Sequence, residues 1–487
     1  MVLFCRVRYI VLLLFQFTLI AQSPSITYIN SDTTWSSDVS ISGKVVVKSG
    51  ATLTINAGTV VKATFTANPV DVTVLVVARG GKIEAAGTAD KPIIFTSEFD
   101  DLTAADVAAG TYVSTEGGAA NDLTTRGLWA GIIMLGKGIV GEDGGEDDIE
   151  GVAEGYDFTT YGGSVADDNS GTLDYVSIRH GGATIANGDE INGLTLGGVG
   201  SGTTISNIEI ISNDDDGIEF FGGNVDVTNI LIFNQKDDAI DIDEAYAGTI
   251  TNAYVAMGAD SDNVFEIDGS EDSTGTVTGS YTIDGVTAYQ AYDNSAKLDQ
   301  YGHWKSGATG ANNNIVFKGF AAGTYLEGVE KATFDAGTLT FSNLDFVTTD
   351  NLATVNSTSS RSASDELAEL TATQAEILAA QASNTGANEG KFTGWTAYDF
   401  NNGGALSIGT DIDIQDSISF YPNPTDGLIN VISERKINTI NVYAVTGQLI
   451  KSAAGEKSID IKEVTPGIYI IEVTTDEQKV LGKLIRK

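Results

Sequence analysis

A repeat of 22 to 23 residues constrains the fold of this chain more than any other feature of its sequence. Its units begin at Asn207, Asn229 and Asn252. Each asparagine opens a short run of alternating apolar and polar residues, which is followed by a polar turn and a second alternating run. A unit of this length cannot bury its apolar face alone, so neighbouring units are expected to stack.

The repeat predicts an all-β fold, a right-handed parallel β-helix in which each unit forms one coil. Apolar side chains would alternate into the interior and stack on their equivalents about 4.8 Å away in the next coil. Two interior columns are expected: Ile208, Ile230 and Ala253 in one, and Ile218, Ile240 and Phe265 in the other. The three leading asparagines would form a ladder at a turn, with their amides paired from coil to coil.

Short β runs separated by glycine turns continue on both sides of the repeat, and four parts are predicted. Residues 1–21 are a signal peptide, 22–364 the β-helix body, 365–415 a helical cap and linker, and 416–487 a small C-terminal β-sandwich. Residues 142–157 contain eight acids and are expected to leave the coil as a loop. Apolar residues recur at helical spacing in 365–382, which predicts an amphipathic helix over the open end of the solenoid.

The N-terminal segment has the pattern of a signal peptide and indicates a secreted protein. Arg6 and Arg8 precede an apolar run that ends at Ile20 and is short for a membrane span, and Ala21 offers a cleavage point. Cys5 is the only cysteine and lies before this run. Cleavage would therefore leave no thiol for a disulfide, a thiolate metal site or a cysteine nucleophile.

Acidic residues dominate the predicted body. The chain carries a formal net charge of −39, and removal of Arg6 and Arg8 with the signal peptide leaves −41. Residues 416–487 hold nine basic and nine acidic residues, so the whole excess lies on residues 22–415. Such a surface repels nucleic acid and anionic membranes, and it suits a soluble extracellular protein or divalent cations.

The C-terminal segment resembles the sorting domain of proteins exported by the type IX secretion system of Bacteroidetes. Four short motifs occur in the order of that family, within 420–427, 442–449, 466–469 and 483–487. The residues that carry the resemblance are Pro422, Asn423, Pro424, Gly427, Gly447, Gly467, Lys483, Arg486 and Lys487. The resemblance implies recognition by the outer-membrane translocon, followed by attachment to surface lipopolysaccharide or release.

The body resembles secreted bacterial β-helix proteins whose function is mostly undefined. The segments that carry this likeness are 80–88, 92–97, 178–182, 191–202 and 216–223. Because some parallel β-helices are pectate lyases or polygalacturonases, an enzyme is the alternative interpretation. A catalytic group would combine a base with carboxylates, and the candidates are Arg179, His180, Asp215, Asp216, Asp237 and Asp238.

Carboxylates that recur at one outward position suggest a cation site. Glu219, Asp241 and Glu266 occupy the same place in successive units, flanked by Asp216, Asp238 and Asp262. Carboxylates stacked about 5 Å apart repel one another unless they are solvated, protonated or bridged, and Ca²⁺ accepts six to eight oxygen ligands with flexible geometry. Ca²⁺ is thus the possible cofactor, with solvated acidic columns as the alternative.

These observations favour a secreted or cell-surface β-helix that acts without catalysis, in adhesion or ligand binding. Its expected partners are the translocon, and surface lipopolysaccharide or an extracellular polysaccharide. The alternative function is a lyase or glycoside hydrolase that acts on acidic polysaccharide. A flat, repetitive outer face would favour adhesion, whereas a groove with converging Arg, His and carboxylates would favour the enzyme.

Overall fold

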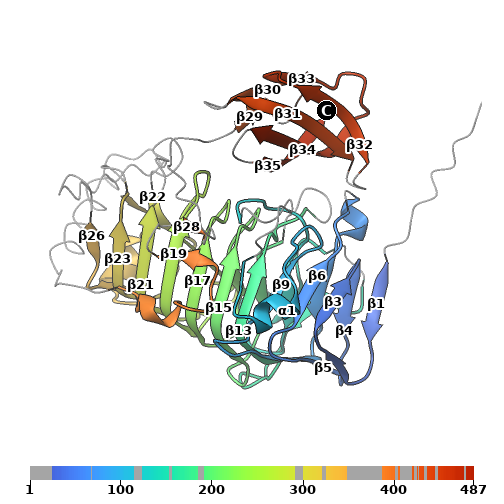
Figure 1. The fold of residues 1–487 in the computed structure, drawn as a ribbon. Helices are drawn as coiled ribbons and strands as arrows, with labels where there is room; N and C mark the ends of the chain where they lie inside the picture. The colour runs from blue at the N-terminus through green and yellow to red at the C-terminus, as the bar shows by residue number, and fades with distance from the viewer. Residues whose placement is uncertain are drawn as a thin grey trace, which may run out of the picture.

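The body of the protein is a parallel β-helix, and the C-terminal part is a separate pair of small sheets (Figure 1). This computed structural model describes residues 25–66, 68–113, 123–152, 156–184, 191–290, 300–320, 325–347, 386–400, 404–405, 419–421, 425, 427–432, 436–444, 448–475 and 479–486. The coils stack side by side along one axis, from blue at the N-terminal end to olive at the far end in Figure 1. The predicted fold class is confirmed.

One long side of the solenoid is a ten-stranded parallel sheet, here called sheet A. Its short strands contribute one segment from each coil. They are, in spatial order, β1 (Ile26–Ile29), β4 (Lys44–Val47), β7 (Val74–Val77), β10 (Ile132–Leu135), β14 (Leu194–Gly197), β16 (Ile218–Phe221), β18 (Ile240–Asp243), β20 (Phe265–Ile267), β22 (Gln300–Trp304) and β24 (Tyr325–Glu327).

The other side is a fourteen-stranded sheet, sheet B, in which the strands are longer. Its main path is β2 (Thr33–Trp35), β5 (Thr52–Ile55), β8 (Lys82–Ala86), β13 (Gly171–Arg179), β15 (Thr204–Ile211), β17 (Val227–Phe233), β19 (Thr249–Met257), β21 (Tyr281–Gln290), β23 (Gly310–Lys318) and β25 (Leu339–Ser342). Beside this path lie β3 (Asp38–Ile41), β6 (Val60–Ala63), β9 (Ile93–Ser97) and β26 (Asp345–Val347). Each main-path strand from β13 to β23 is long enough to replace two shorter strands of the first coils. The first of them, β13, pairs with both β8 and β9.

A ladder of asparagines bends the long strands β15, β17 and β19, as predicted. Asn207, Asn229 and Asn252 have φ values of 52°, 59° and 61°, in the left-handed region that asparagine tolerates better than most residues. The Asn229 Nδ2 donates to Asn207 Oδ1 at 2.9 Å, and Asn252 Nδ2 donates to Asn229 Oδ1 at 2.7 Å. The next position is Gly285, which offers no amide, and Asn252 Oδ1 instead accepts from the backbone N–H of Asn388.

The interior is built from the two predicted columns. Register pairs Ile208 with Ile230 and Ala253 in sheet B, and Ile218 with Ile240 and Phe265 in sheet A. All six are fully buried within one continuous apolar cluster that runs the length of the body. Close packing of equivalent side chains on successive coils is therefore the main source of stability for this part.

Segments that leave the coils cover parts of both outer faces. Residues 136–170 are here called the acidic insertion. Their part 142–157 was predicted to leave the coil as a loop, yet β11 (Glu146–Asp148) lies within that range and pairs antiparallel with β12 (Thr160–Gly162). Ile149 and Phe158 of this insertion are buried against the outer side of sheet A, where they join Val76 and Ile133. The few apolar residues between the acids thus fold the insertion back onto the coil.

A second segment, residues 386–400, lies along the outer side of sheet B. Phe392, Trp395 and Tyr398 pack on outward residues that include Leu231 and Tyr254. The segment contains η2 (Glu389–Lys391) and β27 (Tyr398–Asp399), which pairs with β28 (Gly404–Ala405). The helix predicted over 365–382 lies outside the described residues. Other short helices in the described part of the body are η1 (Pro69–Asp71), α1 (Ala104–Ala108) and α2 (Lys331–Asp335).

The C-terminal domain is a two-sheet sandwich, as predicted. One sheet contains β29 (Ser419–Tyr421), β30 (Leu428–Ile432) and β33 (Ser458–Asp460), and the other contains β32 (Leu449–Ala454), β31 (Ile437–Ala444), β34 (Gly467–Thr475) and β35 (Lys479–Arg486). Residues of both sheets, such as Val431 and Ile471, share one buried core. In the described part of the chain, no helix has the length and apolar character needed to cross a membrane.

The interior columns lead to a first prediction. Ile240→Asp places a carboxylate between Ile218 and Phe265, where it has no cationic partner, and we expect a loss of several kcal/mol in the free energy of unfolding. Urea denaturation followed by tryptophan fluorescence measures this loss. Thr251→Ser, on the outer side of β19, is the control and should change stability little; equal midpoints for Ile240→Asp and the parent would contradict the register.

Candidate functional site

The acidic column predicted from the repeat lies on the outer side of sheet A. Glu219 of β16 pairs in register with Asp241 of β18, which pairs with Glu266 of β20. The column continues to Thr195 on one side and to His303 on the other. The three carboxylates therefore face the same way on consecutive coils, as predicted.

A second column stands at the turn before these strands. Asp216 Oδ1 accepts from the backbone N–H of Asp238 at 2.8 Å, and Asp238 Oδ1 accepts from the backbone N–H of Asn263 at 2.7 Å. The column thus continues to Asn263, and the Asp262 backbone instead bonds the carbonyl of Asp237. The prediction that Asp262 flanks the acidic column with Asp216 and Asp238 is corrected, because Asp262 lies one position earlier in the turn.

Three carboxylates from the two columns converge. Asp216, Glu219 and Asp241 each offer an oxygen within 4.8 Å of the others, and they expose only 7%, 5% and 8% of their surface. The Asn192 amide donates to Glu219 Oε2. The Oδ1 atom of Asp241 is buried and has no hydrogen-bond partner among the described residues. These atoms form a compact set of oxygen donors of the kind that a hard cation prefers.

Burial controls the ionisation of this group. Loss of solvent raises the pKa of Asp216, Glu219 and Asp241 well above the usual carboxyl range, and the neighbouring negative charges raise it further. Three buried carboxylates cannot all remain ionised at this separation without a compensating charge. Protonation or a bound cation would supply that compensation.

The remaining predicted ligands meet a different partner. Lys305 Nζ lies 2.6 Å from Glu266 and 2.8 Å from Asp268, so a lysine already neutralises this end of the column. Burial opposes ionisation of Glu266, but hydrogen bonds with Asp238 and Lys305 outweigh it and lower the pKa of Glu266. Burial raises the pKa of Asp238, and the nearby charge of Glu266 and the hydrogen bond between the two raise it further. The six predicted ligands therefore divide into separate groups.

The predicted catalytic residues divide as well. The acids do gather, since Asp215, Asp216 and Asp237 offer oxygens within 4.8 Å of one another, and Asp238 N–H bonds Asp216. Arg179, however, stands at the end of β13 in sheet B with no exposed side-chain surface. Its guanidinium lies 3.3 Å from Glu209 and donates to the Tyr112 carbonyl at 2.6 Å, so Arg179 is paired away from these acids.

Glu209 completes this buried ion pair and was not foreseen. Its Oε2 accepts from Ser177 Oγ at 2.5 Å, and its Oε1 accepts from the backbone N–H of Ala397 in the segment that covers sheet B. In the next two coils the same position holds Leu231 and Tyr254. The departure from an apolar position in the repeat was the signal available in the sequence.

His180 lies in the turn that follows strand β13 of sheet B. Its φ is 64°, and register places it in one column with Ser212 and Asn234, whose φ values are 57° and 60°. The His180 ring nitrogen Nδ1 lies 2.6 Å from the Thr125 carbonyl. Its side chain is fully buried, so the structure places it in a turn rather than at a surface groove.

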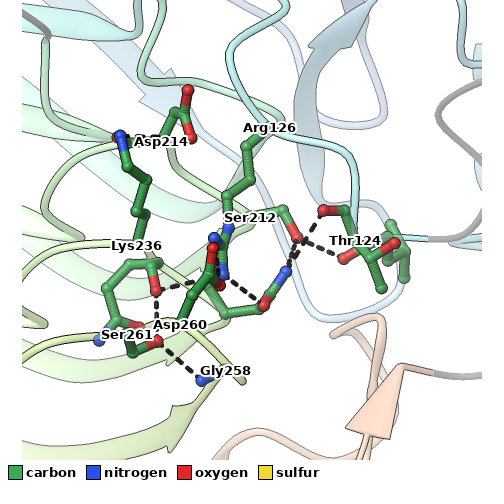
Figure 2. Close-up of polar contacts among 11 residues, drawn as sticks. Thr124, Arg126, Ser212, Asp214, Lys236, Gly258, Asp260 and Ser261 are labelled. Carbon is green, nitrogen blue, oxygen red and sulfur yellow. Dashed lines mark hydrogen bonds and ion pairs between the residues drawn. The ribbon is translucent and has the colours of Figure 1, made fainter. Parts of the chain in front are cut away.

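Figure 2 shows how a neighbouring segment ties these turns together. Arg126 donates to the Asn234 carbonyl at 2.6 Å and forms an ion pair with Asp260 at 2.6 Å. Asn234 donates in turn to Ser212 Oγ at 2.8 Å. Arg126 therefore bridges consecutive turns, and its guanidinium group helps to hold neighbouring coils together.

The sorting residues that the structure describes occupy the C-terminal sandwich. Gly427 has a φ of 136°, and a Cβ there would lie only 2.2 Å from the Lys462 side chain, which explains the need for glycine. Gly467 begins β34, and Lys483 and Arg486 belong to β35, with Arg486 donating to the Lys462 carbonyl at 3.3 Å. Pro422, Asn423, Pro424, Gly447 and Lys487 lie outside the described residues.

A parallel β-helix followed by a small β-sandwich defines a solenoid protein with a separate C-terminal domain, and comparison with known families agrees. The model of the pectate-lyase-like β-helix domain matches residues 27–114 and 113–398, and the model of the secretion-system C-terminal sorting domain matches residues 419–487. This chain belongs to the pectate-lyase-like β-helix family. Its sorting domain shows export by type IX secretion to the cell surface or the extracellular space.

Two further comparisons say little about function. No curated protein matches the chain significantly. Among solved structures, the tailspike protein of Acinetobacter phage vB_ApiP_P1 is similar over 93% of this chain and 72% of its own, with 9% identity and a TM-score of 0.29. A similarity this low supports no functional comparison.

The buried ion pair leads to a second prediction. Arg179→Met leaves the Glu209 carboxylate buried without its cation, and we expect a loss of about 3–5 kcal/mol in the free energy of unfolding. The double variant Arg179→Met, Glu209→Leu should recover much of that loss, because leucine is the residue of the next coil at this position. Urea denaturation tests both, and an Arg179→Met protein as stable as the parent would contradict a structural role.

Proposed function

We propose that this exported protein binds an extracellular polysaccharide through the outer face of sheet B, without catalysis. The observation that carries the proposal is a regular array of short polar side chains on that face. One column runs from Asp174 through Ser206, Thr228, Thr251, Asp284 and Asn313 to Ser342, in continuous register. A parallel column beside it runs from Thr172 through Thr204, Asp226, Thr249, Thr282 and Ala311 to Thr340. We call the two columns the hydroxyl face.

The hydroxyl face is regular in both directions. Equivalent residues stand about 4.8 Å apart from coil to coil, and the two columns are separated by two residues of strand, about 6.6 Å. Thr228 and Thr251 are partly exposed, whereas the residues between the columns, such as Val227 and Ile250, are buried. Short side chains on a hydrogen-bonded sheet lose little conformational entropy when a ligand binds. Their regular spacing favours a ligand whose own groups repeat regularly.

Charge favours a neutral polysaccharide over an acidic one. The chain carries a formal net charge of −39, and Asp174 and Asp284 belong to the hydroxyl face itself. An anionic polymer would be repelled, whereas hydroxyl groups of a neutral sugar can donate to carboxylates and exchange hydrogen bonds with threonine. The burial of Arg179 in an ion pair also supports a non-catalytic function, since a lyase needs an accessible base.

A third prediction tests the hydroxyl face. Thr228→Glu with Thr251→Glu adds two charges at its centre, and we expect co-sedimentation with insoluble cellulose, chitin or curdlan to fall at least about tenfold, which corresponds to about 1.4 kcal/mol. Thr27→Glu, at an exposed position of β1 in sheet A, is the matched control and should bind as the parent does. Absence of parental binding to every neutral polysaccharide would contradict the proposal. Release of new chain ends from acidic polysaccharide would instead support the enzyme.

We also propose that Asp216, Glu219 and Asp241 bind Ca²⁺ and stabilise the solenoid. Support comes from the convergence of their oxygens within 4.8 Å and from the buried, unpartnered Asp241 Oδ1. Asn192 adds a further polar group beside Glu219, and its Oδ1 atom also has no partner among the described residues. A cation bound only by the folded state raises stability by RT ln(1 + [L]/Kd).

A fourth prediction follows for the melting temperature. Calcium should raise the melting temperature more than sodium does at matched ionic strength. When calcium exceeds its Kd a hundredfold, the difference corresponds to a gain of about 2.7 kcal/mol in the free energy of unfolding. Asp241→Asn should shrink that increment because it removes a carboxylate from the centre of the group. Asp167→Asn, which removes an exposed acid elsewhere, should leave it unchanged. Equal shifts from calcium and sodium would mean that the acids are merely screened.

A further inference from the structure

A second convergence of carboxylates occurs where the acidic insertion meets the coil. Glu244 follows β18 directly, and the backbone N–H of Gly141 in the insertion donates to the Glu244 carbonyl at 2.7 Å. Glu244 has a φ of 51°, and the next residue, Ala245, has a φ of 60°. Two consecutive residues in the left-handed region turn the chain sharply and bring the Glu244 side chain under the insertion.

Two acids of the insertion meet Glu244 there. Glu142, Asp147 and Glu244 each offer one oxygen, and these oxygens lie within 4.8 Å of one another. Asp147 belongs to β11 and is exposed, Glu142 is half-buried, and Glu244 exposes 5% of its surface. The group therefore joins residues about 100 positions apart and is open to solvent on the Asp147 side.

Glu244 supplies the observation that points to a ligand. The hydroxyl group of Tyr161 in β12 donates a hydrogen bond to Glu244 Oε1. The second oxygen, Oε2, is buried and has no hydrogen-bond partner among the described residues. A buried carboxylate oxygen without a donor is costly, because it has lost its water and gained nothing in exchange.

The surroundings add negative charge and no basic partner. Glu271, from the loop 268–280, hydrogen-bonds Glu142, so a fourth carboxyl group stands beside the three. Among the described residues, Lys and Arg form no ion pair with Glu142, Asp147 or Glu244. Burial, the bond with Glu271 and nearby charge raise the pKa of Glu142 to about 7, and burial raises that of Glu244 to about 8.

We propose that Glu142, Asp147 and Glu244 bind a divalent calcium ion that fastens the acidic insertion to the coil. Oxygens bound to one Ca²⁺ at 2.3–2.6 Å lie at most about 5 Å apart, which matches the observed spacing. Glu271 is placed to complete the set. Ca²⁺ suits the site better than Mg²⁺, because ligands from separate segments rarely meet the strict octahedral geometry that Mg²⁺ requires.

The ion would act on the side of the insertion that faces the end of β18. On one side Ile149 and Phe158 anchor the insertion in the apolar cluster on sheet A. On the other side its acids face Glu244 and the loop 268–280, where Ser273 Oγ donates to Asp143 at 2.8 Å. Calcium would join three segments here: the insertion, the end of β18 and that loop. This inference is independent of the hydroxyl face and of the cation site at Asp241.

Hydrogen–deuterium exchange of the full exported chain, with calcium as the probe, tests the proposal. Calcium should slow exchange of the β11 and β12 amides, about tenfold when it exceeds its Kd ninefold, since protection scales as 1 + [L]/Kd. Magnesium at the same concentration should have a much smaller effect. Glu142→Gln with Asp147→Asn should abolish the calcium effect on these amides, whereas Asp241→Asn and Asp167→Asn should preserve it.

Three results would overturn the inference. The first is equal exchange of the parental β11 and β12 amides with and without calcium, a measurement that requires no variant to fold. The second is an undiminished calcium effect in the Glu142→Gln, Asp147→Asn protein. The third is loss of the effect in Asp241→Asn, which would assign it to the other cation site.

Discussion

Parallel pairing between equivalent residues of successive coils is the constraint on which the rest of this structure depends. Each strand of sheets A and B forms hydrogen bonds with the strand one coil away. Residues at equivalent positions of successive coils therefore lie about 4.8 Å apart along the axis. For Ile218, Ile240 and Phe265 this repetition builds a continuous core. For the asparagines it builds a ladder of amide hydrogen bonds. The same register stacks carboxylates, where repetition is unfavourable.

The outer faces resolve that conflict in different ways. Lys305 neutralises Glu266 and Asp268 at one end of the acidic column, while Asp216, Glu219 and Asp241 gather without an ion pair to any Lys or Arg that the structure describes. On sheet B, segment 386–400 covers the apolar outward residues, and the columns of threonine and serine beside them stay open. One solenoid thus presents a covered face, an acidic face and a hydroxyl face. Each results from the residue type that the register repeats.

Prediction from sequence succeeded where the repeat is regular. The alternation of apolar residues was sufficient to place Ile208, Ile230 and Ala253 in one column, and the leading asparagines in a ladder. It was also sufficient to align Glu219 with Asp241 and Glu266. It was less exact for Asp262, which lies one position earlier in the turn than Asp216 and Asp238, because Asn263 continues their column.

The sequence by itself determined the coil, its register, the acidic column and the sorting domain, because these depend on neighbours within one or two coils or on local motifs. Only the tertiary structure decided what the outer side chains contact. Glu209 meets Arg179 one coil away and Ala397 from a distant segment, and Glu244 meets Glu142 and Tyr161 of the insertion. Segments that dock from outside the coils follow no period, so no spacing in the sequence records where they lie. Their places result from side-chain packing and from the need to neutralise buried charge.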